Sequence, residues 1–287
     1  MISAPQRARC QYHRRREITI NSCRPDPMNV PFLLAFLLLI GHLGPTHAAA
    51  PDCARPYTLA LHDHGLLYSA DTDSGIDKDV ADELIRRSGC KVTVSLMPRA
   101  RIWQLIESGA LDFSLSGISN SERERFASFV WYFSNKYYLL VRKDSGAQTL
   151  ADFERNDKMQ LGVIRSFRYS ASANRLVDQL QANNRVSQSG GLAPLYKTLL
   201  QNQIQGMIIE PFDFPALEEK KIRELTSIVE FNDPSVPHGL IMSKKALSPA
   251  EQLQWQALLN SMRSDGSMRR IFEKYFKPEL AAAMVNF

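Results

Sequence analysis

Long apolar runs are scarce in this chain of 287 residues. The longest, Phe32–Ile40, has about half of the roughly 20 apolar residues that a transmembrane helix needs, and the small residues of Thr46–Ala50 follow it. A short apolar core before small residues is typical of a secretory signal peptide. Residues 1–50 are therefore predicted to be a leader that is removed on export. Its true start is expected at Met28, with the basic lead Arg14–Arg16 as the alternative.

A large excess of positive charge is also missing once this leader is set aside. The whole chain has 35 Lys and Arg, 30 Asp and Glu, and a net charge of +5. Six of the basic and two of the acidic residues lie within residues 1–50, so the remaining 29 basic and 28 acidic residues leave a net charge of +1. This balance gives no reason to expect binding to nucleic acid or to a membrane surface.

Cysteine is rare, and only Cys53 and Cys90 lie outside the leader. Each precedes a predicted strand, and neighbouring parallel strands begin at the same edge of a sheet. Because an exported chain can be oxidised, we predict a Cys53–Cys90 disulfide, with two buried free thiols as the alternative. No cysteine occupies the position at the cleavage site that a lipoprotein anchor requires.

Metal ligands are scarce as well. His62 and His64 form a pair after the first predicted strand, but no further His or Cys stands at a spacing that would complete a zinc site. Asp71–Gly75 lacks the rest of a calcium loop. We expect no metal and no cofactor, and we expect His64 to line a ligand cleft instead.

Short apolar strands alternate with helical segments along the rest of the chain, which predicts an α/β fold with mostly parallel sheets. Tyr137–Arg142 reads as a strand and runs into the polar break Lys143–Ala147. A second α/β unit begins at Met159–Ile164. It ends at a second polar break, Asn232–His238, after which the chain is expected to return to the first unit.

The turn from Gly117 to Arg123 has the chemistry of a carboxylate site. Backbone amides and the small hydroxyl of Ser119 can donate hydrogen bonds to carboxylate oxygens, and a planar guanidinium can pair with both oxygens at once. The alternative is a strand-to-helix turn with a solvated charged face.

Four blocks in order carry a family resemblance: Gly75–Leu84, Ser108–Phe129, His238–Lys245 and Asp265–Phe276. Together they resemble the family 3 extracellular solute-binding proteins, the periplasmic receptors that supply polar amino acids to ABC importers. The resemblance implies a two-lobed type 2 periplasmic binding fold, with two mostly parallel sheets flanked by helices and a double-crossover hinge. Residues 51–142 and 237–287 are expected to form lobe 1, and residues 143–236 lobe 2.

The resemblance also implies site residues. Arg123, six residues before Phe129, corresponds to the arginine that grips the ligand α-carboxylate, with Gly117 and Ser119 beside it and Arg125 as a weaker candidate. The usual Thr-x-x-Arg reads Asn120-Ser-Glu-Arg here. Glu210, at the end of a second-lobe strand, corresponds to the acid that binds the α-ammonium, although a helix N-terminal acid would read the same.

Two departures from the family pattern add basic residues to the expected cleft. Ser166 and Arg168 stand where the family has Gly-Ser/Thr-Thr, and Arg99 stands where it commonly has an aromatic ring. They indicate a larger or more negative ligand than a neutral amino acid. The alternative for Arg99 is a side chain that extends into solvent at a helix start.

The implied function is a monomeric periplasmic protein, not an enzyme, that captures an amino acid or related carboxylate and docks on the membrane permease of an ABC importer. A cyclohexadienyl-dehydratase-like enzyme on the same fold is one alternative, with Glu210 and His64 as its only available acid/base pair. A ligand-sensing partner of a membrane receptor is the other.

Overall fold

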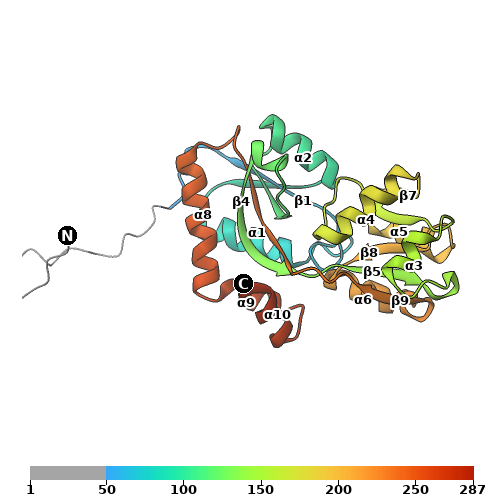
Figure 1. Cartoon of the computed structure of the whole chain (residues 1–287). Helices are drawn as coiled ribbons and strands as arrows, with labels where there is room; N and C mark the ends of the chain where they lie inside the picture. Colours follow the sequence, from blue (N-terminus) through green and yellow to red (C-terminus); the bar gives the residue numbers. More distant parts are fainter. Residues whose placement is uncertain (1–49) are drawn as a thin grey trace, which may run out of the picture. The chain divides into compact units, whose positions relative to one another are not determined.

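A computed structural model describes residues 50–287 of the chain (Figure 1). The predicted leader, apart from its last residue, lies outside these residues. Two five-stranded sheets flanked by helices make up the described part, which confirms the expected α/β class. Among residues 50–287, no helix has the length and apolar character needed to cross a membrane.

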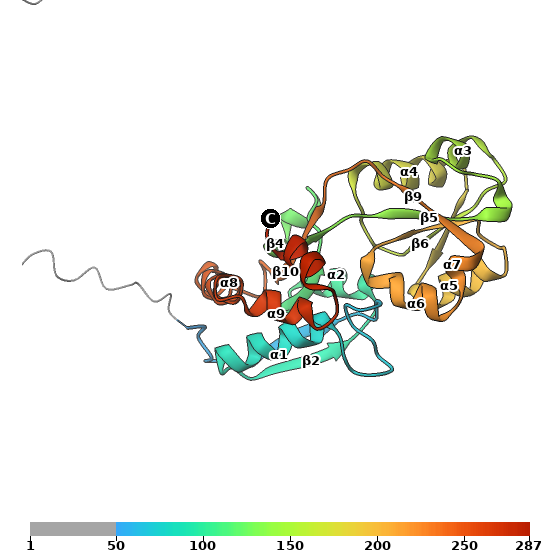
Figure 2. The same cartoon turned by 90° about the horizontal axis from the view of Figure 1, so that it is seen from below.

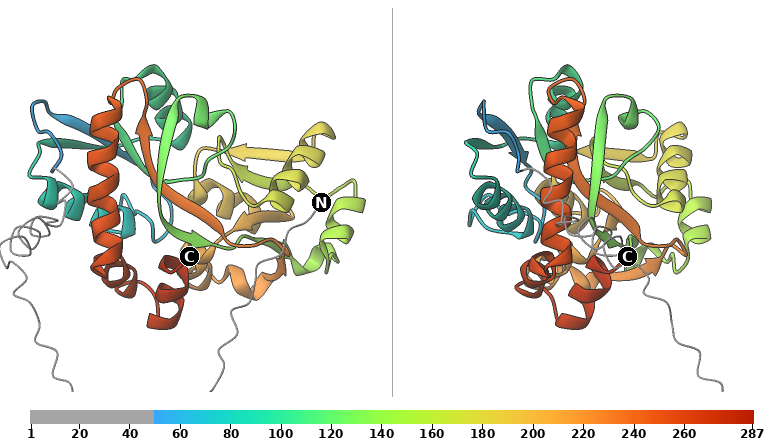
Figure 3. Two further views of the ribbon diagram at one scale, coloured as in Figure 1. Left: turned by 60° about the vertical axis from the view of Figure 1, so that its left-hand side comes forward. Right: turned by 90° about the vertical axis from the view of Figure 1, so that its left-hand side faces the viewer.

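The first sheet, with the helices around it, is called the first lobe. Its strand order is β2-β1-β3-β10-β4, and β10 alone runs against its neighbours, so four of the five strands point the same way. The strands are β1 (Tyr57–Leu61), β2 (Val92–Leu96), β3 (Phe113–Gly117), β4 (Ala127–Asn135) and β10 (Val236–Ser243). The helices are α1 (Ile76–Ser88), α2 (Arg99–Ser108), α8 (Pro249–Ser264), α9 (Ser267–Glu273) and α10 (Pro278–Val285). Figure 3 shows the last three helices following one another beside β4.

The second lobe repeats this plan. Its strand order is β7-β6-β8-β5-β9, and here β5 is the reversed strand. The strands are β5 (Tyr138–Arg142), β6 (Leu161–Ile164), β7 (Val186–Ser189), β8 (Gly206–Ile209) and β9 (Thr226–Glu230). The helices are α3 (Leu150–Arg155), α4 (Ala171–Ala182), α5 (Leu192–Leu200), α6 (Phe214–Glu219) and α7 (Ile222–Leu225). Short 3-10 turns stand at η1 (Arg123–Arg125), η2 (Lys143–Ser145) and η3 (Pro211–Asp213).

Local sequence explains several of these elements. Helix α1 buries Ile76, Val80 and Leu84, which recur at helical spacing, and it ends at Gly89 in the left-handed conformation. Helix α8 begins with a capping box in which Ser248 and Glu251 each bond the other's backbone N–H. Such caps fix where the helices begin, and the apolar faces fix which side meets the sheet.

The chain crosses between the lobes twice, from β4 into β5 and from β9 into β10 (Figure 2). The expected first boundary, at residue 142, is wrong by one strand: Tyr138–Arg142 pairs with β8 and β9, so it belongs to the second sheet. Its sequence predicts a strand but says nothing about the strand's neighbours. The second crossing reaches the first sheet at Val236, the first residue of β10.

The second lobe is anchored in the first by Phe212. Its ring is fully buried within the first lobe's core and packs edge-on against Phe133, with 5.4 Å between ring centroids. Leu66 donates its N–H to the carbonyl oxygen of Phe212 at 3.0 Å. A Cβ atom at Gly65, whose φ is +52°, would lie 2.4 Å from that oxygen, so the close approach requires glycine.

Cys53 and Cys90 form the predicted disulfide. Their Cα atoms are 5.0 Å apart, and the bond ties the segment before β1 to the segment between α1 and β2. The starts of the paired parallel strands β1 and β2 therefore lie at one sheet edge, as the sequence indicated.

Replacing both cysteines by serine is expected to lower the free energy of unfolding by about 3 to 4 kcal/mol, because the bond links residues 37 positions apart in the unfolded chain. For a domain of this size the midpoint of thermal unfolding should fall by about 10 °C. Wild-type protein unfolded under a reducing agent is the control and should match the double variant. Equal midpoints for the double variant and the oxidised wild type would contradict this prediction.

Candidate functional site

Arg123 projects from the turn after β3 into the space between the lobes. Its side chain is buried, and its guanidinium carbon lies 3.9 Å from the centre of the Trp103 ring. Nη1 donates to the carbonyl of Ile118 at 2.8 Å, and Nη2 donates across the cleft to the carbonyl of Ser166 at 2.7 Å. Burial lowers the pKa of Arg123 to about 9. Within residues 50–287, no carboxylate forms a salt bridge with it.

Arg99, the first residue of α2, is a second buried guanidinium nearby. Nη1 donates to the carbonyl of Leu115 at 3.0 Å, and Nη2 donates to Nε2 of His62 at 3.0 Å. Burial lowers the pKa of Arg99 to about 10, and burial together with the charge of Arg99 lowers that of His62 well below 6.5. His62 is therefore neutral and accepts at Nε2. In the described part of the chain Arg99, too, has no carboxylate within salt-bridge distance.

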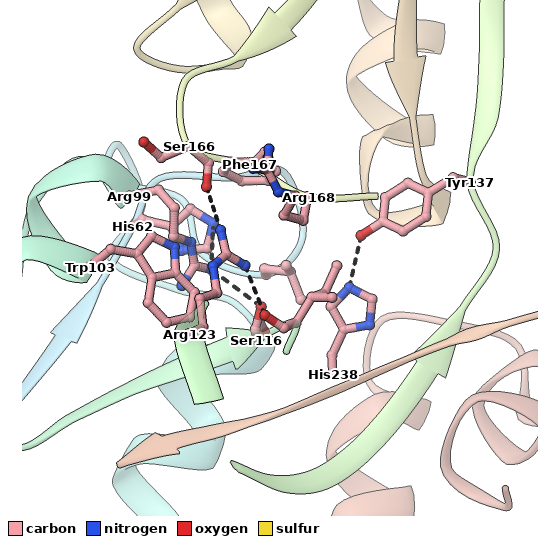
Figure 4. Close-up of a pocket in the computed structure, with 12 residues that line it drawn as sticks. His62, Arg99, Trp103, Ser116, Arg123, Tyr137, Ser166, Phe167, Arg168 and His238 are labelled. Atoms are coloured by element: carbon pink, nitrogen blue, oxygen red, sulfur yellow. Dashed lines mark hydrogen bonds between the residues drawn. The ribbon is translucent and has the colours of Figure 1, made fainter. Parts of the chain in front are cut away.

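These two arginines line a small cavity between the lobes, called here the inner cavity (Figure 4). Its volume of about 20 Å³ is room for about one water molecule. The first lobe supplies most of the lining, and Ser166, Phe167 and Arg168 come from the loop after β6. The full lining is His62, Leu67, Arg99, Trp103, Ser116, Ile118, Arg123, Tyr137, Ser166, Phe167, Arg168 and His238. These residues include three arginines and no acidic side chain.

His238 and Tyr137 stand at the side of the cavity where the chain crosses between the lobes (Figure 4). His238 Nδ1 lies 2.9 Å from the carbonyl oxygen of Val236, so it carries the proton and donates. Nε2 then accepts from the hydroxyl of Tyr137 at 2.8 Å. Burial lowers the pKa of His238 to about 4, so this ring is neutral at physiological pH.

Two lining residues have left-handed backbone conformations that side chains other than glycine rarely adopt. Ser116 has φ +53° and Ser166 has φ +62°. Ser116 is held by hydrogen bonds to Asp77, at 2.6 Å, and to Tyr132. Ser166 presents its carbonyl oxygen to Arg123. Backbone strain of this kind gathers at ligand sites, where the surrounding structure maintains it.

Glu210 lies next to the inner cavity but does not line it. Its Oε1 is 2.7 Å from Nε2 of His64, and its Oε2 accepts from the amide of Asn135 at 2.8 Å. All three side chains are buried, so a second-lobe carboxylate is enclosed between two first-lobe partners. Neither His64 nor Glu210 is among the residues that line the inner cavity.

Comparisons with known proteins decide the family. The sequence pattern of the bacterial extracellular solute-binding proteins, family 3, matches residues 64–278, about three quarters of the chain. This chain belongs to that family. No curated protein matches it.

Solved structures resemble this family 3 protein in fold. An ancestral arginine-binding protein bound to arginine is 19% identical, with a TM-score of 0.65 over 78% of this chain and 100% of its own. An ABC uptake transporter substrate-binding protein from Streptococcus pneumoniae with bound histidine is 18% identical, with a TM-score of 0.64 over 77% of this chain and 92% of its own. A histidine kinase sensor domain with similarity to periplasmic binding proteins is 14% identical, with a TM-score of 0.65 over 79% and 98%.

The structure gathers four of the residues predicted to bind ligand around the inner cavity: Arg99, Arg123, Ser166 and Arg168. Gly117 and Ser119 do not line it. A Cβ atom at Gly117 would lie 2.2 Å from the side chain of Ile241, so this glycine is required by packing. For each of these residues a direct contact with ligand stays a prediction.

Sequence reasoning missed several lining residues. Ser116 lines the cavity, whereas the prediction named Gly117 and Ser119. Successive strand residues point to opposite faces, so Ser116 and Gly117 could not both face the ligand. Trp103 has the helical spacing of a core residue with Leu105 and Ile106, and it is buried, but its ring also packs against the Arg123 guanidinium. Tyr137 and His238 flank the two crossings between lobes, which could have marked them as cleft residues.

We expect the His64–Glu210 pair to stabilise the protein in a limited pH range. Burial by itself would lower the pKa of His64, but the hydrogen bond with Glu210 and the charges of Asp213 and Glu210 outweigh it and raise that pKa above 6.5. Burial by itself would raise the pKa of Glu210, but His64 outweighs it and lowers that pKa below 4.5. The stabilisation is therefore complete between about pH 4.5 and 6.5. It is lost above the raised pKa of His64 and below the lowered pKa of Glu210.

A double-mutant cycle with His64→Gln and Glu210→Gln, measured by urea unfolding from pH 4 to 9, tests this prediction. The coupling energy should be about 2 to 3 kcal/mol near pH 5.5 and should decrease as the pH rises through the pKa of His64. The exposed pair Lys78–Asp82, 2.6 Å apart, is the control, with an expected coupling of about 0.5 kcal/mol or less. A buried coupling that grows towards pH 9, or that equals the control, would contradict the prediction.

Proposed function

We propose that this protein is the periplasmic binding component of an ABC importer and that it captures a small carboxylate-bearing solute, an amino acid or a related acid, between its lobes. One observation carries the proposal: two buried guanidiniums, Arg99 and Arg123, line one cavity between the lobes without an acidic partner among its lining residues. The protein acts as a monomer, and its N-terminal leader directs its own export to the periplasm.

Buried positive charge with no carboxylate within salt-bridge distance favours an anionic ligand. Burial disfavours the charged form of both arginines, and the carbonyl oxygens of Leu115, Ile118 and Ser166 compensate for it only in part. A carboxylate in the cavity would supply a full negative charge and two acceptor oxygens in the geometry that a guanidinium matches. Arg168, on the facing loop, adds to the positive potential there.

Ligand entry requires the lobes to separate. The inner cavity holds about one water molecule, so this structure represents a closed arrangement. Rotation about the two crossings, between β4 and β5 and between β9 and β10, would move the Ser166 loop away from Arg123. A ligand that contacts both lobes favours the closed arrangement through those contacts, which is a hinge-type population shift.

The alternative classes receive less support. An enzyme would need an acid/base pair at the ligand, and although His64 and Glu210 lie 2.7 Å apart, neither lines the inner cavity. A sensory role is favoured by the likeness in fold to a histidine kinase sensor domain, and it would use the same ligand site. Co-purification of the ligand-bound protein with a membrane permease or with a receptor kinase would distinguish import from sensing.

A thermal-shift screen of the protein against amino acids, dicarboxylates and polyamines tests the carboxylate assignment. A ligand at 100 times its dissociation constant should stabilise the protein by about 2.7 kcal/mol. Carboxylate-bearing compounds should give the shifts and polyamines none. A shift from polyamines alone, or none from the whole set, would contradict the proposed function.

Arg123→Ala is expected to weaken binding of the best carboxylate from this screen at least 100-fold, because removing one partner of a buried charge pair costs about 3 kcal/mol or more. Arg125→Ala is the matched control: it removes an exposed arginine two residues away and should change the dissociation constant less than twofold. Isothermal titration calorimetry at pH 7 measures both. If the two variants exchange these effects, Arg125 is the carboxylate ligand.

Glu210 is proposed to bind a ligand ammonium group, which requires the His64 contact to open. Glu210→Gln should then weaken binding of norleucine at least tenfold and leave hexanoate, the same molecule without its amine, within about twofold, because only norleucine loses a charge partner. Glu230→Gln, an exposed acid of the same lobe, is the control. Equal losses for both compounds would show that Glu210 acts on closure alone.

A further inference from the structure

The space between the lobes continues beyond the inner cavity. A second cavity of about 430 Å³, called here the outer cavity, shares His62, Arg99 and Phe167 with the inner one. Its size lies within the range of roughly 300 to 1,000 Å³ of small-molecule sites, whereas the inner cavity admits about one water molecule. The two cavities meet at Arg99, so a group held there has open space on its outer side.

The walls of the outer cavity are mainly apolar. Of its fourteen lining residues only His62, Asp63 and Arg99 carry polar side chains. Apolar side chains come from both lobes: Leu96, Met97 and Pro98 on one side, and Ile164, Leu192 and Pro194 on the other. Leu96 is 49% exposed, a large fraction for a leucine beside a ligand site. Covering such surface is favourable, so the cavity suits an apolar group.

Phe167 lines both cavities. Its ring packs against the rings of His62 and His64, with centroid distances of 5.5 and 5.0 Å, and the guanidinium of Arg99 is 5.7 Å from its centre. One face of the site is thus charged and the other apolar, with an aromatic ring at the border. A ligand that used both cavities would have its carboxylate at the arginines and its body beyond Phe167.

The outer cavity offers little to a cationic group. Asp63 is its single acidic residue; the side chain is exposed, and its Oδ1 accepts from the N–H of Ala70 at 3.1 Å. Arg99, at the inner end, repels a second cation. For a ligand with a positively charged tip, the cavity would therefore provide apolar walls and a single carboxylate, Asp63, that is exposed to solvent and already accepts a hydrogen bond.

We propose that the ligand is a carboxylate with an extended apolar arm, as long as that of norleucine or longer, and that the outer cavity holds this arm. This inference rests on the proposed function, because the head group is the carboxylate held at Arg99 and Arg123. It deepens that function by assigning the class of ligand and by naming the residues that select it.

Titration calorimetry with alanine, norleucine and lysine tests the inference on the wild-type protein. Norleucine has three more methylenes than alanine, and each buried methylene tightens binding about fourfold, so norleucine should bind about 50-fold more tightly. Lysine has the same four-carbon side chain as norleucine with an ammonium group at its end, and it should bind no more tightly than alanine. Equal affinities for alanine and norleucine, or lysine as the tightest of the three, would overturn the inference.

Variants that fill the outer cavity test its location. Ala193→Phe, in the first turn of α5, should weaken norleucine at least tenfold and leave alanine within about twofold. Gly191→Leu is a second filler at a position with extended backbone, where an added Cβ meets no atom within 4 Å. Ala171→Phe, on an exposed alanine in the first turn of α4, is the matched control and should leave both constants unchanged.

The two proposals fail in different ways. If no carboxylate in the set binds, the proposed function is wrong. If alanine and norleucine both bind, Arg123→Ala abolishes both, and the fillers leave norleucine unaffected, then the carboxylate site stands and the apolar arm does not lie in the outer cavity. Fillers that weaken norleucine and alanine equally would show that they obstruct closure and would also overturn the inference.

Discussion

The burial of two guanidiniums where the lobes meet is the constraint on which the rest of the site depends. A buried charge must find hydrogen-bond acceptors, and here the acceptors are mostly backbone carbonyls. Leu115 belongs to β3, Ile118 follows that strand, and Ser166 follows β6, so all three oxygens come from at or near the carboxyl ends of strands. Four strands of each sheet point the same way, so these ends gather at one edge. The sheet topology thereby places carbonyl oxygens that compensate in part for the two guanidinium charges. The uncompensated part favours an anion between the two lobes.

In the closed arrangement the two edges must face each other in a defined way. The segment Glu210–Phe212 provides that alignment beside the crossings. Its carboxylate is enclosed by His64 and Asn135, and the Phe212 ring lies in the first lobe's core, where Gly65 leaves room for its carbonyl. Leaving one member of a buried ion pair without its partner is strongly destabilising, so the pair disfavours every alternative alignment that would leave one charge unpaired. The same pair is expected to make the contact between the lobes depend on pH.

Charge and apolar surface are separated within the cleft. The inner cavity holds all three arginines together with histidines, hydroxyls and a few apolar side chains, whereas the outer cavity is lined mainly by apolar side chains of both lobes. Phe167 and Arg99 belong to both. A loop whose backbone is strained at Ser166 positions Phe167, so the border between the two regions depends on a conformation that the facing arginine helps to hold. In this way the residues proposed to bind the ligand's carboxylate differ from those proposed to select its apolar arm.

The sequence by itself determined the α/β class, the family and the Cys53–Cys90 bond, because these rest on short-range patterns: apolar alternation, ordered motifs and residues placed just before strands. It predicted the arginines of the cleft only through the resemblance to the family. Only the tertiary structure decided the rest. Strand Tyr138–Arg142 joined the second sheet because its partners are β8 and β9, which its own residues do not specify. Glu210 bonds to His64, 146 positions away, and does not line the inner cavity in this arrangement, which its position at a strand end could not reveal. Local periodicity fixes which face a side chain presents, but the neighbour it meets there is set by how distant elements pack.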